Sequence, residues 1–115
     1  MTEHDIFVST DSPAAVVRAN IEAALGAAFK ASQDAEPVPA LAIGTTKVFF
    51  HDSHLFEDDK DFAVSRYRYW VSVEDSARDE ERQLAIAQQV FDALKAEGWP
   101  VMLSFDLQGS LAVYP

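Results

Sequence analysis

The spacing of hydrophobic residues changes several times along this chain, and that change limits the folds it can adopt. In the segment 10–29, TDSPAAVVRANIEAALGAAF, Val17, Ile21 and Leu25 recur at the spacing of one helix face. In the segment 62–75, FAVSRYRYWVSVED, apolar and polar residues alternate, which is typical of a strand with one buried face. The sequence therefore predicts both helices and strands, each with a single apolar side.

The segment 76–100, SARDEERQLAIAQQVFDALKAEGWP, has the clearest helix boundaries in the chain. Ser76 and Asp79 resemble a capping box at its start, Gly98 suits the left-handed position that ends many helices, and Pro100 prevents continuation. The apolar residues at helical spacing predict the buried stripe of this helix, which consists of Leu84, Ala87, Val90, Phe91 and Leu94.

Five segments have the composition of strands, with many β-branched and aromatic residues. They are 5–10, 41–52, 62–75, 101–107 and 110–114, and the inferred order is strand, helix, two strands, helix, two strands. This order predicts an α+β fold, a two-layer sandwich in which two helices pack on one face of a mainly antiparallel sheet. Its topology resembles the ferredoxin-like order β-α-β-β-α-β-β, and residues 1–115 are expected to form a single domain.

If the strand at 62–75 alternates regularly, its two faces carry different side chains. Tyr67, Tyr69, Val71 and Val73 then point to the core, whereas Val64, Arg66, Arg68, Trp70 and Ser72 point to the other face. That second face has no helix to cover it, so it is expected to be open and available for a partner or for homodimer formation. Tryptophan flanked by arginine is typical of binding hot spots, although arginine stems can also simply cover an aromatic ring.

The segment 51–61, HDSHLFEDDKD, combines two histidines with five acidic residues. These are residue types of a metal site, but His51 and His54 are not at the spacing that aligns two ligands on a helix, and no EF-hand pattern is present. The chain also contains no nucleophile elbow, no glycine-rich phosphate loop and no cysteine. The segment is therefore interpreted as a charged loop, and no metal and no cofactor are expected.

Acidic residues outnumber basic ones by 19 to 9, which gives a formal net charge of −10 at pH 7. Binding to nucleic acid or to an anionic membrane depends on basic side chains, so both are disfavoured. Strong acidity instead favours association with a basic protein, because the field of the chain attracts it over a distance. No segment resembles a signal peptide or a membrane span, and a cytoplasmic location is expected.

Two functions remain open from the sequence, which carries no family signature. The first is a non-enzymatic interaction module that binds a basic protein, as immunity proteins and secretion chaperones do. Its candidate contact residues are Glu57, Asp58, Asp59, Asp61, Arg66, Arg68 and Trp70. The second is a small-molecule-binding domain or dimeric enzyme with a pocket between sheet and helices, whose candidate polar groups are His51, His54, Tyr67 and Tyr69. The lack of a catalytic motif favours the first.

Overall fold

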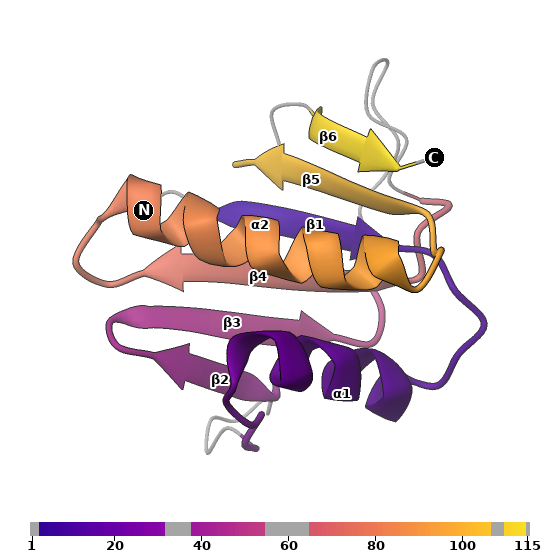
Figure 1. The fold of residues 1–115 in the computed structure, drawn as a ribbon, viewed down its shortest axis with the longest axis horizontal. Coiled ribbons are helices and arrows are strands. Elements are labelled where there is room, and N and C mark those ends of the chain that lie inside the picture. The colour runs from indigo at the N-terminus through magenta and orange to yellow at the C-terminus, as the bar shows by residue number, and fades with distance from the viewer. Residues whose placement is uncertain (1–2, 32–37, 55–64, 107–109, 115) are drawn as a thin grey trace.

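A computed structural model describes residues 3–31, 38–54, 65–106 and 110–114. Within them the chain forms β1 (His4–Val8), α1 (Ala14–Leu25), β2 (Ala40–Ile43), β3 (Thr46–His51), β4 (Tyr69–Asp75), α2 (Glu80–Ala96), β5 (Val101–Phe105) and β6 (Ser110–Tyr114). These strands form one antiparallel sheet in the order β2-β3-β4-β1-β5-β6. Figure 1 shows both helices on the same side of that sheet.

The α+β class and the antiparallel sheet with two helices are confirmed, but the ferredoxin-like order is not. β1 lies between β4 and β5 and runs antiparallel to both. The segment 41–52, predicted as one strand, contains parts of two, because β2 and β3 pair with each other across Gly44 and Thr45. Gly44 has φ 58°, a left-handed conformation that glycine adopts at little cost, and this permits the tight turn.

β4 is shorter than the strand predicted at 62–75. It begins at Tyr69, the stretch 65–68 is a turn followed by irregular backbone, and 62–64 lie outside the described residues. Tyr69, Val71 and Val73 point into the main core as predicted, whereas Tyr67 is buried in a separate cluster. The assignment of Tyr67 to the same face was wrong because strand alternation does not extend back to it.

Pro13 and Gly26 set the ends of α1. Pro13 is extended (φ −61°, ψ 152°) and no side chain caps the helix, while Gly26 ends it in the left-handed conformation with φ 68°. The Gly26 N–H donates to the carbonyl oxygen of Glu22 at 2.8 Å. Val17 and Ile21 are the buried residues of this helix, in agreement with the spacing in the sequence.

The structure corrects two details of α2. Asp79 is itself the N-cap, accepting a hydrogen bond from the Arg82 N–H at 3.1 Å, whereas Ser76 donates to the Thr45 carbonyl. Leu84, predicted in the buried stripe, is 39% exposed. The residues of α2 that are buried are Gln83, Ile86, Ala87, Val90, Phe91 and Leu94. Gly98 has the predicted left-handed conformation (φ 81°).

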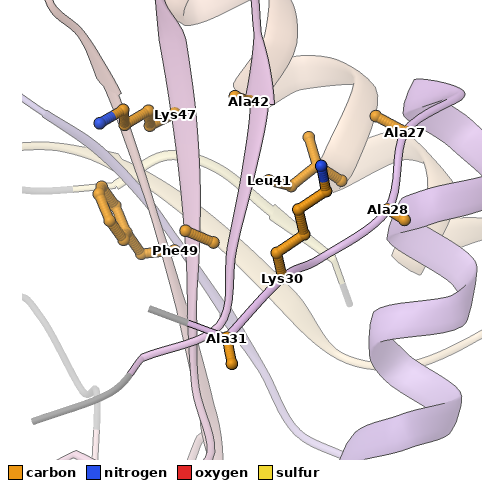
Figure 2. Close-up of a pocket in the computed structure, with 9 residues that line it drawn as sticks. Ala27, Ala28, Lys30, Ala31, Leu41, Ala42, Lys47 and Phe49 are labelled. Carbon is orange, nitrogen blue, oxygen red and sulfur yellow. The ribbon is translucent and has the colours of Figure 1, made fainter. Parts of the chain in front are cut away.

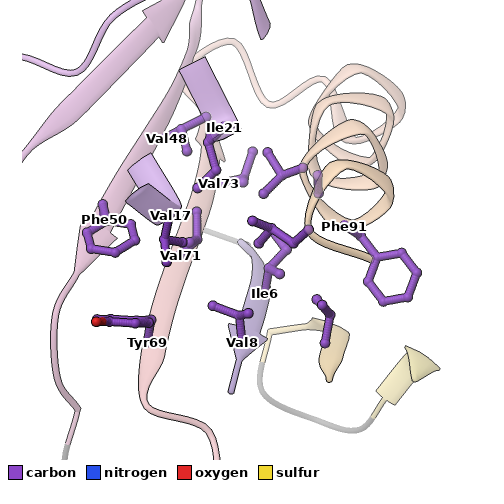
Figure 3. Packing of buried hydrophobic residues seen from close by; sticks show 14 of the residues in the cluster. Ile6, Val8, Val17, Ile21, Val48, Phe50, Tyr69, Val71, Val73 and Phe91 are labelled. Carbon is purple, nitrogen blue, oxygen red and sulfur yellow. The ribbon is translucent and has the colours of Figure 1, made fainter. Parts of the chain in front are cut away.

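The main hydrophobic core lies between the helices and one face of the sheet (Figure 3). Side chains from neighbouring strands meet there, since Ile6 of β1 lies directly opposite both Val71 of β4 and Leu103 of β5. Val17 and Ile21 of α1 pack into the same core. Burial of these side chains favours one register of the strands, and that register also positions the side chains of the opposite face.

Asp75, the last residue of β4, connects three elements. Its Oδ1 accepts hydrogen bonds from the hydroxyls of Thr45 (2.6 Å) and Thr46 (2.8 Å), and its Oδ2 accepts one from the Asp79 N–H (2.9 Å). The hydrogen bond from Thr45 and that from Asp79 are the main causes that lower the pKa of Asp75. The carboxylate thus joins the β2–β3 turn to the start of α2.

Neither helix in the described ranges combines the length and the apolar content that crossing a membrane requires. The predicted hairpin turn at Gln108 and Gly109 lies outside the described residues.

Candidate functional site

Trp70, the aromatic residue of the predicted contact surface, is half-buried and hydrogen-bonded inward. In the sheet it lies opposite Phe7 of β1 and His51 of β3. Its Nε1–H donates to Asp5 Oδ1 at 2.8 Å, and its ring stacks on that of His51 with centroids 3.8 Å apart. Trp70 is therefore part of a polar and aromatic cluster on the sheet face opposite the helices.

The two arginines of the same predicted surface stack on tyrosines. Cζ of Arg66 lies 5.0 Å from the ring centroid of Tyr67, whose hydroxyl accepts a hydrogen bond from Arg66 Nη2 at 3.0 Å. Cζ of Arg68 lies 4.8 Å from the ring centroid of Tyr69. Both arginines are exposed. They contact different clusters, since Tyr67 belongs to the second hydrophobic cluster and Tyr69 to the main core. Such contacts are expected if the arginine side chains only cover aromatic rings. The other predicted contact residues, Glu57, Asp58, Asp59 and Asp61, lie outside the described residues.

The two histidines proposed for a pocket lie on the same face as Trp70. His54 Nε2 is 2.6 Å from the Tyr67 carbonyl oxygen, and because that oxygen only accepts, this nitrogen carries the proton. His51 Nε2 is 3.3 Å from Ser72 Oγ. Burial lowers the pKa of His51, with Asp52 acting in the opposite direction. His51, His54 and Tyr67 are thus brought together around Trp70.

Tyr69, the fourth pocket candidate, is not part of this group. It lies on the helix side of the sheet, where its hydroxyl donates to the Ser12 carbonyl oxygen at 2.8 Å. None of the four candidates lines the hollow beside β2, the hollow at the first turns of α2 or the hollow bordered by Thr45 and Glu74. The structure therefore gives each of these side chains a hydrogen-bonded position.

The sheet face opposite the helices is not open at its centre. Phe7, Tyr67 and Met102 are buried there as a second hydrophobic cluster, against which Trp70 packs. Phe7 and Met102 lie opposite each other in the β1–β5 pair. The expectation of an open face is wrong at these positions, which solvent barely reaches, and homodimer formation through this face stays a prediction.

Asp5 is a fully buried carboxyl on the same face. It lies between Ser72 of β4 and Ser104 of β5. Its Oδ1 accepts the Trp70 hydrogen bond, and the neighbouring Ser104 hydroxyl has no hydrogen-bond partner within the described chain. Burial raises the pKa of Asp5 to about 6, against the lowering effect of the Trp70 hydrogen bond. The second face thus contains a carboxyl that titrates close to neutral pH.

Further carboxyl groups converge where β1 begins and β4 and β5 end. The Glu3 N–H donates to Asp106 Oδ1 at 3.2 Å, and the Asp106 N–H donates to the Glu3 carbonyl at 2.8 Å. Burial, followed by the nearby carboxyls of Asp5 and Glu74, raises the pKa of Glu3 to about 8. α2 starts at this end of the sheet (Figure 1). We call Glu3, Glu74, Asp79, Glu80, Glu81 and Asp106 the acidic end.

Sequence reasoning did not single out Glu3 or Asp5. The available signal was Asp5 itself, a charged residue directly before the apolar run Ile6, Phe7 and Val8. A carboxyl in such a strand is costly to bury, which makes it a candidate for a special role. Its partners could not be named in advance, because they come from β4 and β5.

A hollow of about 450 Å³ lies beside β2 (Figure 2). Its lining is mostly alanine, and its charged members are Lys30 and Lys47, which are both exposed. Figure 2 shows the Lys47 side chain directed away from Lys30. Since no buried polar side chain lines this hollow, it does not define a ligand site.

In the part of the chain that the structure describes, no three or more histidine, aspartate or glutamate side chains are arranged to hold a metal ion. Comparisons with protein-family models, with curated proteins and with solved structures found no match for this chain. The fold and the surface together define an α+β protein whose sheet carries carboxyl groups at one end and a buried aromatic cluster on the face away from the helices.

Proposed function

We propose that this protein is a non-enzymatic interaction module that binds a basic protein through the acidic end, in the cytoplasm. The observation that carries the proposal is that carboxyl groups from the residue before β1, from β4, from the residue after β5 and from the start of α2 gather in one region. The formal net charge of −10 adds long-range attraction for a basic partner. Immunity proteins and secretion chaperones work in this way, by covering a basic surface of another protein.

The raised pKa of Glu3 supports a binding site for a positively charged group at this position. Burial, Asp5 and Glu74 all raise the pKa of Glu3. Lys47 lies opposite Glu74 in the β3–β4 pair and offsets only part of the local charge. A lysine or arginine from a partner would favour the ionised form of Glu3 and lower its pKa. Binding near neutral pH would therefore release a proton from Glu3.

Calorimetric titration with a short Lys- and Arg-rich peptide tests both the binding and the proton release. We expect an affinity that falls as salt is raised, and a binding heat at pH 7 that depends on the ionisation enthalpy of the buffer. Glu3→Gln should abolish the buffer dependence, because the proton is then absent. Binding without proton release would place the peptide elsewhere on the protein.

Charge-matched variants distinguish binding at the acidic end from a general effect of the net charge on peptide affinity. The double variant Glu74→Gln, Glu81→Gln should weaken peptide binding by about tenfold at low salt. Asp11→Asn with Glu97→Gln removes the same charge from exposed residues after the end of β1 and at the C-terminal end of α2, away from the acidic end, and should change the affinity by less than about threefold. Equal losses in both variants would mean that the peptide responds only to net charge, and the proposed site would be wrong.

The acidic residues of the 51–61 segment are the rival surface. If they form the contact, Glu57→Gln, Asp58→Asn and Asp59→Asn together should slow association while the acidic-end variant binds as the wild type does. Failure of every basic peptide to bind, at any salt concentration, would contradict the interaction function itself.

A further inference from the structure

A second hollow, of about 310 Å³, lies between the first turns of α2 and the edge formed by β5 and β6. We call it the Leu84 groove, and it is lined by His4, Glu80, Glu81, Leu84, Phe105 and Leu111. Its two leucines are its exposed apolar residues, since Leu84 is 39% and Leu111 57% accessible. The groove thus has an apolar interior and shares Glu80 and Glu81 with the acidic end.

The exposure of Leu84 follows from its neighbour. Gln83 is buried because its side-chain amide bonds to the Asp75 N–H and to His4, and this turns the adjacent Leu84 toward solvent. A single exposed leucine is ordinary on a protein surface. Leu84 and Leu111, however, come from distant segments and line the same hollow, which makes one apolar patch of the kind found at interaction sites.

The interior of the groove is uncharged. The ring of His4 packs on Phe105 with centroids 4.8 Å apart, and its Nδ1 accepts a hydrogen bond from Gln83 Nε2 at 2.7 Å. The neutral imidazole therefore carries its proton on Nε2. The carboxylates of Glu80 and Glu81 lie at the edge of this neutral interior, so an occupant is favoured that is apolar at its centre and positive at its flanks.

We infer that the Leu84 groove receives an apolar side chain of the basic partner, flanked in the partner's sequence by lysine or arginine that reach Glu80 and Glu81. This inference rests on the proposed function and adds the kind of segment that is recognised. A second copy of this chain is a poor occupant, because each copy carries a formal net charge of −10 and the groove itself has an acidic edge.

Two synthetic peptides of equal charge test the inference, one with a leucine and a phenylalanine between lysine and arginine residues, the other with alanine at both places. The wild type should bind the first at least about tenfold more tightly, since only that peptide buries large apolar side chains. Leu84→Gln with Leu111→Gln should remove this preference and leave the affinity for the alanine peptide unchanged. Val16→Gln with Val113→Gln is the matched control, because Val16 and Val113 are also exposed (43% and 49%) but do not line the groove.

The outcomes separate this inference from the proposed function. Equal affinity for both peptides, or an equal loss in the control variant, would overturn the groove assignment and leave an acidic binding module. Failure of both peptides to bind would overturn the proposed function as well. Concentration-dependent dimerisation that disappears in Leu84→Gln, Leu111→Gln would make the groove a self-association site and overturn the inference. Thermal unfolding of each variant shows that it is folded.

Discussion

Gln83 Nε2 lies 2.7 Å from His4 Nδ1, and this buried hydrogen bond joins α2 to β1. The same amide accepts a hydrogen bond from the Asp75 N–H at 3.0 Å through its oxygen. Because the oxygen faces an N–H group, the amide nitrogen must face His4, and His4 Nδ1 must be an acceptor. A glutamine on the buried side of a helix thus fixes both the rotation of α2 and the tautomer of a histidine.

Replacement of Gln83 should therefore be costly. Gln83→Leu keeps an apolar side chain of similar size but leaves the Asp75 N–H and His4 Nδ1 buried without partners, so we expect a loss of about 2 kcal/mol in the free energy of unfolding. Urea denaturation measures it. Gln89→Leu, at an exposed position of the same helix, should change that free energy by less than about 0.5 kcal/mol. Similar losses in both variants would disprove the role of the Gln83 amide.

The pH dependence of stability should reflect His4. Burial lowers the pKa of His4 from its ordinary value of 6.5, with Glu80 and Asp106 acting against this shift. The unfolded chain therefore binds a proton at higher pH than the folded chain, so the contribution of neutral His4 is complete above pH 6.5 and is lost as pH falls below it. An NMR titration of the histidine ring protons follows this group directly. A His4 resonance that titrates above pH 6.5 would contradict the hydrogen bond to Gln83.

Glu3 should act in the opposite direction. Its pKa is raised from 4.5 to about 8 in the folded chain. The contribution of protonated Glu3 to the stability of the fold is therefore complete below pH 4.5 and is lost as pH rises through 8. Glu3→Gln should flatten the fall in stability between these limits and raise the stability at pH 9 by on the order of 1 kcal/mol, a value reduced by solvent screening of a partly exposed group. Thermal unfolding at several pH values checks this. Glu97→Gln, an exposed control on the other end of α2, should keep the wild-type slope.

The bond from Trp70 to Asp5 gives a further prediction. Trp70→Phe removes the N–H that lowers the pKa of Asp5, so that pKa should rise above about 6. At pH 7.5, where Asp5 is ionised, the loss of a hydrogen bond to a buried carboxylate should cost about 2 kcal/mol, and at pH 4 less. Carboxyl NMR and chemical denaturation at the two pH values measure both effects. Trp99→Phe is the control, because Trp99 packs against the main core, and it should leave the titration of Asp5 unchanged.

Local pattern was sufficient for elements whose burial follows a regular period. Val17 and Ile21, and Val71 and Val73, are core residues as their spacing predicts. The same rule failed at Leu84, because helical spacing allows neighbouring positions to face the core, and the choice of Gln83 depends on hydrogen bonds to distant residues. The turn at Gly44 was missed because a lone glycine in an apolar strand also fits a bulge.

The candidate site was harder to predict, because it depends on strand pairing. Trp70 and Asp5 are 65 residues apart in the sequence, and only the register of β1 against β4 brings them into contact. Single residues such as Trp70 could be chosen for their chemistry. Their neighbours could not, since shifting a strand by one residue would turn each side chain to the other face.

β1 joins two halves of the sheet, with β2, β3 and β4 on one side and β5 and β6 on the other. It is the first of these strands to leave the ribosome, and both strands that pair with it are made much later. Until then Ile6, Phe7 and Val8 have no sheet to enter, and contacts between such distant segments form slowly. The nascent chain must therefore keep this strand, which is fully buried in the folded protein, from aggregating while the rest of the domain is translated.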